Sequence, residues 1–169
     1  MVPTSLNLPQ HLLSHLSSGG GCKFAEFDEQ DIAAILSIEK DLNPSPWSEE
    51  NFRSSIARLH VCIGIKQDQN WIAYAVCSKV MDEAELLIIG VDKSHQGKGF
   101  GKCLLSALIE LLQPSTRTLF LEVRESNQRA IALYENTGFN CVGQRANYYP
   151  PAGKKTAREN ANIYALEFV

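Results

Sequence analysis

The chain has 169 residues, and at roughly 100–200 residues per domain this length predicts a single domain. A hydrophobic content of 44% and a charged content of 21% are typical of a globular protein that buries a core. The 16 Lys and Arg residues are outnumbered by 19 Asp and Glu residues, so the net charge of −3 disfavours nucleic acids and anionic membranes as partners. A polyanion must therefore be bound by a local group of residues.

The cysteines and the N-terminus indicate the compartment. The five cysteines are odd in number, widely spaced and without a CxxC pair, which argues against both a disulfide framework and a zinc site. The chain does not start with the basic residues and apolar run of a secretory signal, and no stretch reaches the roughly 18 apolar residues of a membrane span. We expect a cytoplasmic protein that binds no membrane.

The first 22 residues differ in composition from the rest. Residues 1–22 contain no Asp, Glu, Lys or Arg and end in a Ser/Gly-rich run that is typical of linkers. We expect a flexible N-terminal extension at 1–22 and one folded domain at 23–169. Four leucines of the extension lie at helical spacing: Leu8, Leu12, Leu13 and Leu16. This spacing predicts a short amphipathic turn that packs on the domain or on a partner.

From residue 22 onward the hydrophobic pattern switches between the strand and helix periods. Strands are predicted at 22–27, 60–66, 71–80, 84–92, 118–123, 139–144 and 162–169, and helices at 29–42, 49–58, 102–112 and 126–137. Ser48 is the expected N-cap of the second helix, and Gly138 the residue that ends the fourth. The order β-α-α-β-β-β-α-β-α-β-β predicts an α/β fold with a mixed sheet of six to seven strands and helices on both faces.

A glycine-rich loop at 96–102 is the most informative segment. It reads Gln-Gly-Lys-Gly-Phe-Gly-Lys and lies between a predicted buried strand and an amphipathic helix. Alternating glycines let the backbone approach an anion, and the free N–H groups at a helix start donate to it. Lys98 and Lys102 add two cations. The loop predicts a local phosphate site, and the alternative is a flexible glycine-rich turn.

Two common phosphate-binding motifs do not fit this loop. A Walker A motif requires Gly where Gln96 stands and Ser or Thr where Cys103 stands. The dinucleotide motif GxGxxG requires Gly at the positions of Lys102 or Leu104. Nucleotide hydrolysis and nicotinamide chemistry therefore lose their main support.

The remaining pattern, Q-x-x-G-x-G at 96–101, occurs together with the strand LLIIGVD and the segment LFLEVRESNQRAIALYENTGF at 119–139. This combination resembles the GCN5-related N-acetyltransferase (GNAT) family over about residues 23–168. The segments PWSEENF, LEVRESN, ALYENTGF and NYYP are similar to the bacterial members that acetylate the N-terminal alanine of a small-subunit ribosomal protein. The resemblance implies direct acetyl transfer from acetyl-CoA to that alanine, without a metal and without a covalent enzyme intermediate.

The resemblance also implies where acetyl-CoA binds. The glycine loop would hold the pyrophosphate, and the main chain at the end of the strand at 84–92 would hold the pantetheine arm. An amide there would also polarise the thioester carbonyl. The implied cofactor-binding residues are Ile89, Gly90, Val91, Gln96, Gly97, Lys98, Gly99, Phe100, Gly101, Lys102 and Asn127.

Two residues are candidates for proton transfer. Glu122 lies in an otherwise apolar strand, where burial disfavours the charged form of a carboxylate and makes it a better base. The alternative for Glu122 is a salt bridge to the neighbouring Arg124. The resemblance makes Glu122 the general base and Tyr134 the acid that protonates the leaving sulfur. The alternative for Tyr134 is a purely structural role in the core.

The sequence contains fewer signals for the residues that bind the acceptor amine. Trp47, Tyr148 and Tyr149 resemble the walls of the peptide groove in the family, and the alternative is that they only pack in the fold. Two other functions stay open: the same chemistry on other protein N-termini or small amines, and a non-enzymatic acyl-CoA-binding regulator. We expect a monomer or weak homo-oligomer that binds no nucleic acid.

Overall fold

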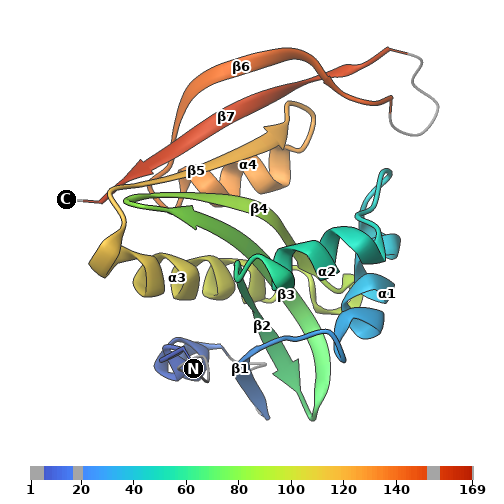
Figure 1. The fold of residues 1–169 in the computed structure, drawn as a ribbon, viewed down its shortest axis with the longest axis vertical. Coiled ribbons are helices and arrows are strands. Elements are labelled where there is room, and N and C mark those ends of the chain that lie inside the picture. The colour runs from blue at the N-terminus through green and yellow to red at the C-terminus, as the bar shows by residue number, and fades with distance from the viewer. Residues whose placement is uncertain (1–5, 17–20, 152–156, 169) are drawn as a thin grey trace.

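A seven-stranded sheet in the order β1-β2-β3-β4-β5-β7-β6 forms the centre of the molecule in the computed structural model, which describes residues 6–16, 21–151 and 157–168 (Figure 1). The strands are β1 (Cys22–Glu26), β2 (Val61–Gln67), β3 (Asn70–Val80), β4 (Glu83–Val91), β5 (Thr118–Arg124), β6 (Asn140–Tyr149) and β7 (Glu159–Glu167). The α-helices are α1 (Ile32–Leu42), α2 (Glu49–Ala57), α3 (Phe100–Leu112) and α4 (Gln128–Glu135). The predicted α/β class, mixed sheet and element order are confirmed.

The strands β4 and β5 separate along their length, and this opens the sheet. They are the one parallel pair in the described sheet, and they pair only over Glu83–Leu86 and Thr118–Leu121. Both continue, β4 to Val91 and β5 to Arg124, without pairing further with each other, and Figure 1 shows them diverging. A bulge at Leu87 interrupts the pairing of β4 with β3. The free edge of β4 therefore faces the opening.

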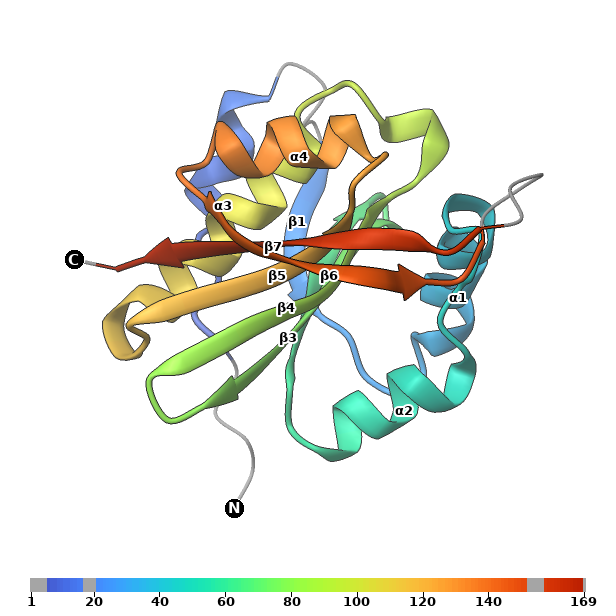
Figure 2. The same cartoon turned by 90° about the horizontal axis from the view of Figure 1, so that it is seen from above.

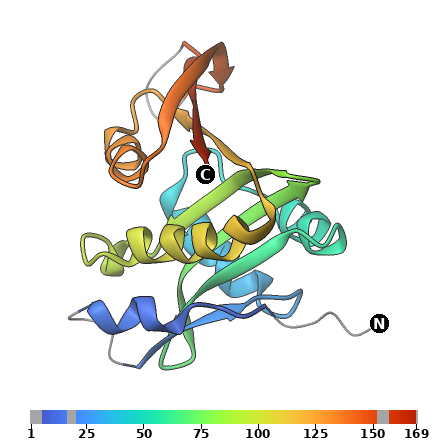
Figure 3. The ribbon, with the colours of Figure 1, turned by 90° about the vertical axis from the view of Figure 1, so that its left-hand side faces the viewer.

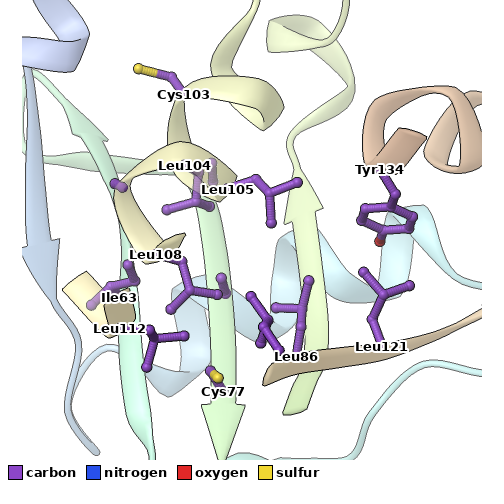
Figure 4. Packing of buried hydrophobic residues seen from close by; sticks show 14 of the residues in the cluster. Ile63, Cys77, Leu86, Cys103, Leu104, Leu105, Leu108, Leu112, Leu121 and Tyr134 are labelled. Atoms are coloured by element: carbon purple, nitrogen blue, oxygen red, sulfur yellow. The ribbon is translucent and has the colours of Figure 1, made fainter. Parts of the chain in front are cut away.

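The helices cover both faces of the sheet, with α3 and α4 on one side and α1 and α2 on the other (Figure 2). Leu104, Leu105 and Leu108 of α3 are fully buried against β2, β3 and β4, as Figure 4 shows. Burial of each such side chain stabilises the fold by about 1.5–3 kcal/mol. In the described part of the chain, no helix is long and apolar enough to cross a membrane.

The helix ends follow local sequence signals. The Ser48 side chain accepts a hydrogen bond from the Asn51 N–H, and the Asn51 side chain accepts one from the Ser48 N–H, which completes a capping box. Gly138 has a φ of 96°, and the N–H groups of Gly138 and Phe139 donate to Glu135 and Tyr134 at 3.1 Å, as in a Schellman motif. The predicted roles of Ser48 and Gly138 are thus confirmed.

Several predicted boundaries were wrong: α1 begins at Ile32 rather than at residue 29, β7 begins at Glu159 rather than at residue 162, and α4 is two residues shorter at each end. Helix α3 begins at Phe100 rather than at residue 102, because Gly99 takes a φ of 91° and serves as its N-cap. Strand β6 continues through the segment that we predicted to be a polar connection and ends at Tyr149. It does so through an irregularity at Asn147, whose φ is 53° and whose N–H donates to Asn160 Oδ1 at 2.9 Å. Asn tolerates this left-handed backbone better than most residues.

The described part of the N-terminal extension packs against the domain. The Gln10 side chain donates to the Phe24 carbonyl at 3.0 Å and accepts from the Phe24 N–H at 2.8 Å, along the outer edge of β1. Leu13 is 4% exposed and joins the core, and the Cys103 thiol donates to the Leu12 carbonyl. Figure 3 shows this segment beside β1 and α3. Residues 6–16 thus pack on the domain, as the spacing of the four leucines predicted. Residues 1–5 and the Ser/Gly-rich run at 17–20 lie outside the described residues.

Candidate active site

Two adjoining cavities lie where β4 and β5 separate. The larger has a volume of about 470 Å³ and lies between the end of β4, the glycine loop and α4. It is lined by Leu42, Asn43, Ile89, Gly90, Val91, His95, Gln96, Gly97, Gly99, Phe100, Gly101, Lys102, Asn127, Arg129, Ala130, Leu133 and Tyr134. Every predicted cofactor-binding residue except Lys98 therefore lines one cavity. Lys98 is exposed.

The glycine loop has the backbone geometry of an anion site. Gly97 and Gly99 have φ values of 77° and 91°, which residues with a Cβ rarely adopt. Phe100, Gly101 and Lys102 form the first turn of α3, where backbone N–H groups lack intrahelical acceptors. These N–H groups and the positive end of the helix dipole favour a phosphate at the cavity wall.

Gln96 connects the two sides of the larger cavity. Its Nε2 donates to the Val91 carbonyl at the end of β4 at 3.0 Å, and its Oε1 accepts from Arg129 of α4 at 2.6 Å. The side chain thus ties the loop to both β4 and α4. Sequence reasoning did not single out Arg129; the available signal was a cation in the first turn of the helix after β5.

The smaller cavity has a volume of about 190 Å³ and shares Asn43, Ile89, Asn127 and Tyr134 with the larger one. It is lined by Glu39, Asn43, Pro44, Ser45, Trp47, Leu86, Leu87, Ile88, Ile89, Glu122, Val123, Arg124, Asn127, Tyr134 and Tyr149. The two proton-transfer candidates and two of the three predicted acceptor residues therefore meet in it. We call it the acceptor cavity and the larger one the donor cavity.

The Glu122 carboxylate forms a salt bridge with a residue of β6. The Glu122 Oε1 lies 2.9 Å from the Arg145 Nε. Arg124 instead pairs with Glu159 at 3.3 Å and donates to the Pro150 carbonyl, so the proposed alternative of a Glu122–Arg124 bridge is wrong. The Arg124 guanidinium lies at the start of β7, where Glu159 provides a more buried carboxylate. Arg145 was missed because it comes from a strand that does not neighbour β5.

Tyr134 lies at the junction of the two cavities. It is 5% exposed and packs against the rings of Phe139 and Tyr164 at 5.9 and 6.4 Å. Figure 4 shows its ring reaching from α4 toward Leu121 of β5. Burial, with a smaller effect of Tyr149, raises the pKa of the Tyr134 phenol above its ordinary value. The hydroxyl makes no hydrogen bond to the described part of the chain, so it is available to a bound molecule.

Asn127 and the aromatic residues have structural contacts as well. Asn127 is the N-cap of α4, and its Oδ1 accepts from the Ala130 N–H at 3.2 Å. Trp47 packs edge-on against Phe52 at 5.2 Å while it lines the acceptor cavity. Tyr148 is 42% exposed and does not line that cavity, although burial and the nearby Glu122 raise its pKa.

Comparison with known proteins places this geometry in a family. The model of the acetyltransferase (GNAT) family matches residues 32–139, which is more than half of the chain. The chain belongs to the GNAT family. It is an acetyltransferase, and acetyl-CoA is its acetyl donor. The phosphate-binding geometry of the donor cavity fits this donor.

Curated relatives and solved structures share nearly the whole GNAT domain. The [ribosomal protein bS18]-alanine N-acetyltransferases of Haemophilus ducreyi and Escherichia coli K12 are each 41% identical, over 82% and 84% of this chain and 94% and 95% of the relatives. The crystal structure of the ribosomal-protein-S18-alanine N-acetyltransferase from Escherichia coli has a TM-score of 0.81 and 38% identity, and covers 87% of this chain and 94% of that one.

Replacing Gly99 by Val is expected to raise the dissociation constant for acetyl-CoA at least fivefold. The added side chain disfavours the φ of 91°, and its Cβ would lie 2.8 Å from Leu16 Cδ2, so the loop must shift and its N–H groups no longer converge. Isothermal titration with acetyl-CoA measures the effect. Gly143→Ala is the control, because its Cβ would meet only Ile163 at an ordinary 3.6 Å. An unchanged constant in Gly99→Val would contradict this role of the loop.

Proposed function

We propose that this acetyltransferase transfers the acetyl group of acetyl-CoA to the N-terminal alanine of a small-subunit ribosomal protein, in the cytoplasm. The relatives named for this reaction on bS18 are about 41% identical over almost their whole length, and this observation carries the proposal. The acceptor cavity supports it, because it adjoins the donor cavity and is lined by both proton-transfer candidates. We further propose that the protein acts as a monomer or weak homo-oligomer.

The proposed donor site is the donor cavity. The first-turn N–H groups of α3 bind the pyrophosphate, and Arg129, held by Gln96, adds a cation beside them. The free edge of β4 at Ile89, Gly90 and Val91 offers main-chain groups to the pantetheine arm. Acetyl-CoA supplies the acetyl group as a thioester when it is bound there.

Glu122 is proposed as the general base. An α-amino group with a pKa of about 7.7–8.0 is mostly protonated at neutral pH and attacks only after it loses a proton. The Glu122 carboxylate lines the acceptor cavity and takes that proton, directly or through a water molecule. Arg145, at 2.9 Å from one carboxylate oxygen, fixes the orientation of the side chain, and the Tyr148 hydroxyl also interacts with this carboxylate.

Tyr134 is proposed as the general acid. Because burial raises the pKa of its phenol, the hydroxyl stays protonated over the whole physiological range. Its position at the junction of the cavities, together with its free hydroxyl, supports the donation of that proton to the departing sulfur. The proton that Glu122 takes from the amine is released to solvent, and the Tyr134 proton is replaced from it.

A release assay for CoA thiol with defined amines tests the proposed acceptor. A peptide that carries the alanine-first N-terminus of bS18 is expected to be acetylated, and mass spectrometry is expected to locate the acetyl group on the α-amino nitrogen. The same peptide with a formylated N-terminus is the control and is expected to be inert. Turnover on polyamines with none on the alanine peptide would overturn the proposal, as would binding of acetyl-CoA without turnover on any amine.

A further inference from the structure

Glu39 is a buried carboxylate that the proposed mechanism does not use. It lies near the end of α1 and is 1% exposed. No ion pair joins it to a cation within the described residues. An unpaired buried charge is costly unless hydrogen bonds compensate it, and an apolar side chain of similar size would fill the same space at lower cost. The position of the carboxylate therefore calls for an explanation beyond packing.

Three donors from two different parts of the fold converge on Glu39. The Trp47 N–H donates to Oε1 at 2.9 Å, and the Asn43 side-chain amide donates to Oε2. The Tyr74 hydroxyl of β3 also donates to Oε2. Asn43 and Trp47 belong to the segment between α1 and α2, which we call the α1–α2 loop (residues 43–48). Glu39 therefore ties this loop to the central sheet.

The α1–α2 loop forms one wall of the proposed site. Asn43, Pro44, Ser45 and Trp47 line the acceptor cavity, and Asn43 also lines the donor cavity. This loop has no strand or helix ladder to hold it, so its place depends on side-chain contacts such as those of Glu39. The two hydrogen bonds from the loop to one carboxylate fix both of its ends.

Tyr74 links Glu39 to the donor cavity, because it contacts both Glu39 and Gly90. Its side chain is fully buried and packs directly on Gly90 of β4, where a Cβ would lie only 2.6 Å from the Tyr74 oxygen. Gly90 is one of the residues whose main chain faces the donor cavity. Burial and the adjacent Glu39 raise the pKa of the Tyr74 phenol, so it remains a hydrogen-bond donor. A continuous contact therefore runs from Gly90 through Tyr74 and Glu39 to the α1–α2 loop.

We propose that Glu39, held by Tyr74, is a positioning residue for the acceptor: it sets the α1–α2 loop at a fixed distance from the β4 edge, so that the acceptor amine meets the acetyl group. This inference rests on the proposed function and adds to it a residue outside the proton-transfer pair. Neither Glu39 nor Tyr74 takes part in the chemistry. Their loss affects how the acceptor is bound, while the site for acetyl-CoA keeps the glycine loop and α4.

Tyr74→Phe is the sharpest test, because it removes one hydroxyl and keeps the ring that packs on Gly90 and, at 5.9 Å, on Phe52. The KM for the acceptor peptide is expected to rise about five- to twentyfold, while the dissociation constant of acetyl-CoA stays within about twofold. Glu39→Gln is expected to raise the same KM further. The Gln side chain keeps one acceptor oxygen but replaces the other by an NH2 group, which cannot accept the hydrogen bonds that the carboxylate oxygen accepts now.

Tyr164→Phe is the matched control. The Tyr164 hydroxyl donates to Glu135 at 2.9 Å, so this variant also removes a tyrosine–glutamate hydrogen bond from a buried ring, but outside both cavities. It is expected to lower the melting temperature less than Tyr74→Phe does, because Glu135 is exposed to water, and to leave the acceptor KM unchanged. A purely structural role of Glu39 would leave the acceptor KM unchanged in both variants.

Two outcomes would overturn the positioning role. One is an acceptor KM unchanged in both Tyr74→Phe and Glu39→Gln while the proteins are folded, and the other is a parallel rise of the acceptor KM and the acetyl-CoA dissociation constant. The proposed function fails separately, through absence of wild-type turnover on the alanine peptide. In that case the KM comparison is made with whichever primary amine the wild type acetylates, so the positioning role is still decided.

Discussion

Replacing Glu122 by Gln is expected to lower kcat at neutral pH by about 10²–10⁴-fold, which is the usual range for loss of a general base. Gln keeps the shape of the side chain but cannot take a proton from the amine. The dissociation constant of acetyl-CoA is expected to stay within about twofold, because Glu122 does not line the donor cavity. Steady-state kinetics with the alanine peptide and titration with acetyl-CoA measure the two effects.

The pH dependence separates base catalysis from a structural effect. Below the amine pKa of about 7.7–8.0 most of the acceptor is protonated and needs the base, whereas above it the neutral amine is already present. The deficit of Glu122→Gln is therefore expected to shrink as the pH rises from 7 to 9. Glu125→Gln is the control, because Glu125 follows β5, lines neither cavity, and its carboxylate accepts hydrogen bonds from Asn160 and Gln144. A deficit that is equal at every pH, or a kcat within threefold of wild type, would contradict the role of Glu122.

The sequence was sufficient for the fold and for the glycine loop that lines the donor cavity. The hydrophobic periods of strands and helices depend on residues close in sequence. The glycines at 97 and 99 and the N-cap at Ser48 are also local sequence signals, so all of these features could be predicted from neighbouring residues. The donor cavity is formed mainly by two such segments, the glycine loop and the start of α4. Ten of its 17 lining residues were predicted as cofactor-binding residues, whereas Arg129 of α4 and Leu42 and Asn43, which come from another segment, were not.

The acceptor side depends on contacts between distant segments, which periodicity does not determine. Arg145 reaches Glu122 from β6, a strand that pairs with β7 and not with β5. The irregularity at Asn147 then decides which of the two neighbouring tyrosines reaches the cavity, and it is Tyr149. One signal was present but not used: Glu39 falls on the same helical stripe as Ile32 and Ile35, where a carboxylate requires buried partners.

Replacing Tyr134 by Phe is expected to lower kcat about 10²–10³-fold with an unchanged acetyl-CoA dissociation constant. The ring contacts with Phe139 and Tyr164 remain, and only the hydroxyl at the junction of the two cavities is lost. The leaving group is a thiol with a pKa of about 8.5, so it can depart as a thiolate without being protonated first. The decrease in kcat is therefore expected to be smaller for Tyr134→Phe than for Glu122→Gln. The same kinetic and binding measurements apply, with Tyr164→Phe as the matched loss of a tyrosine hydroxyl.

The raised pKa of Tyr134 makes this prediction specific in pH. A raised phenol pKa means that the proton donor is intact at and beyond the ordinary value of about 10, so the wild-type rate is expected to rise with deprotonation of the amine and then stay level to pH 10. An acid with a lowered pKa would instead give a falling alkaline limb, which Tyr134→Phe would remove. Such a limb would contradict the raised pKa of the Tyr134 phenol, and a kcat equal to wild type in the variant would contradict its role as the proton donor.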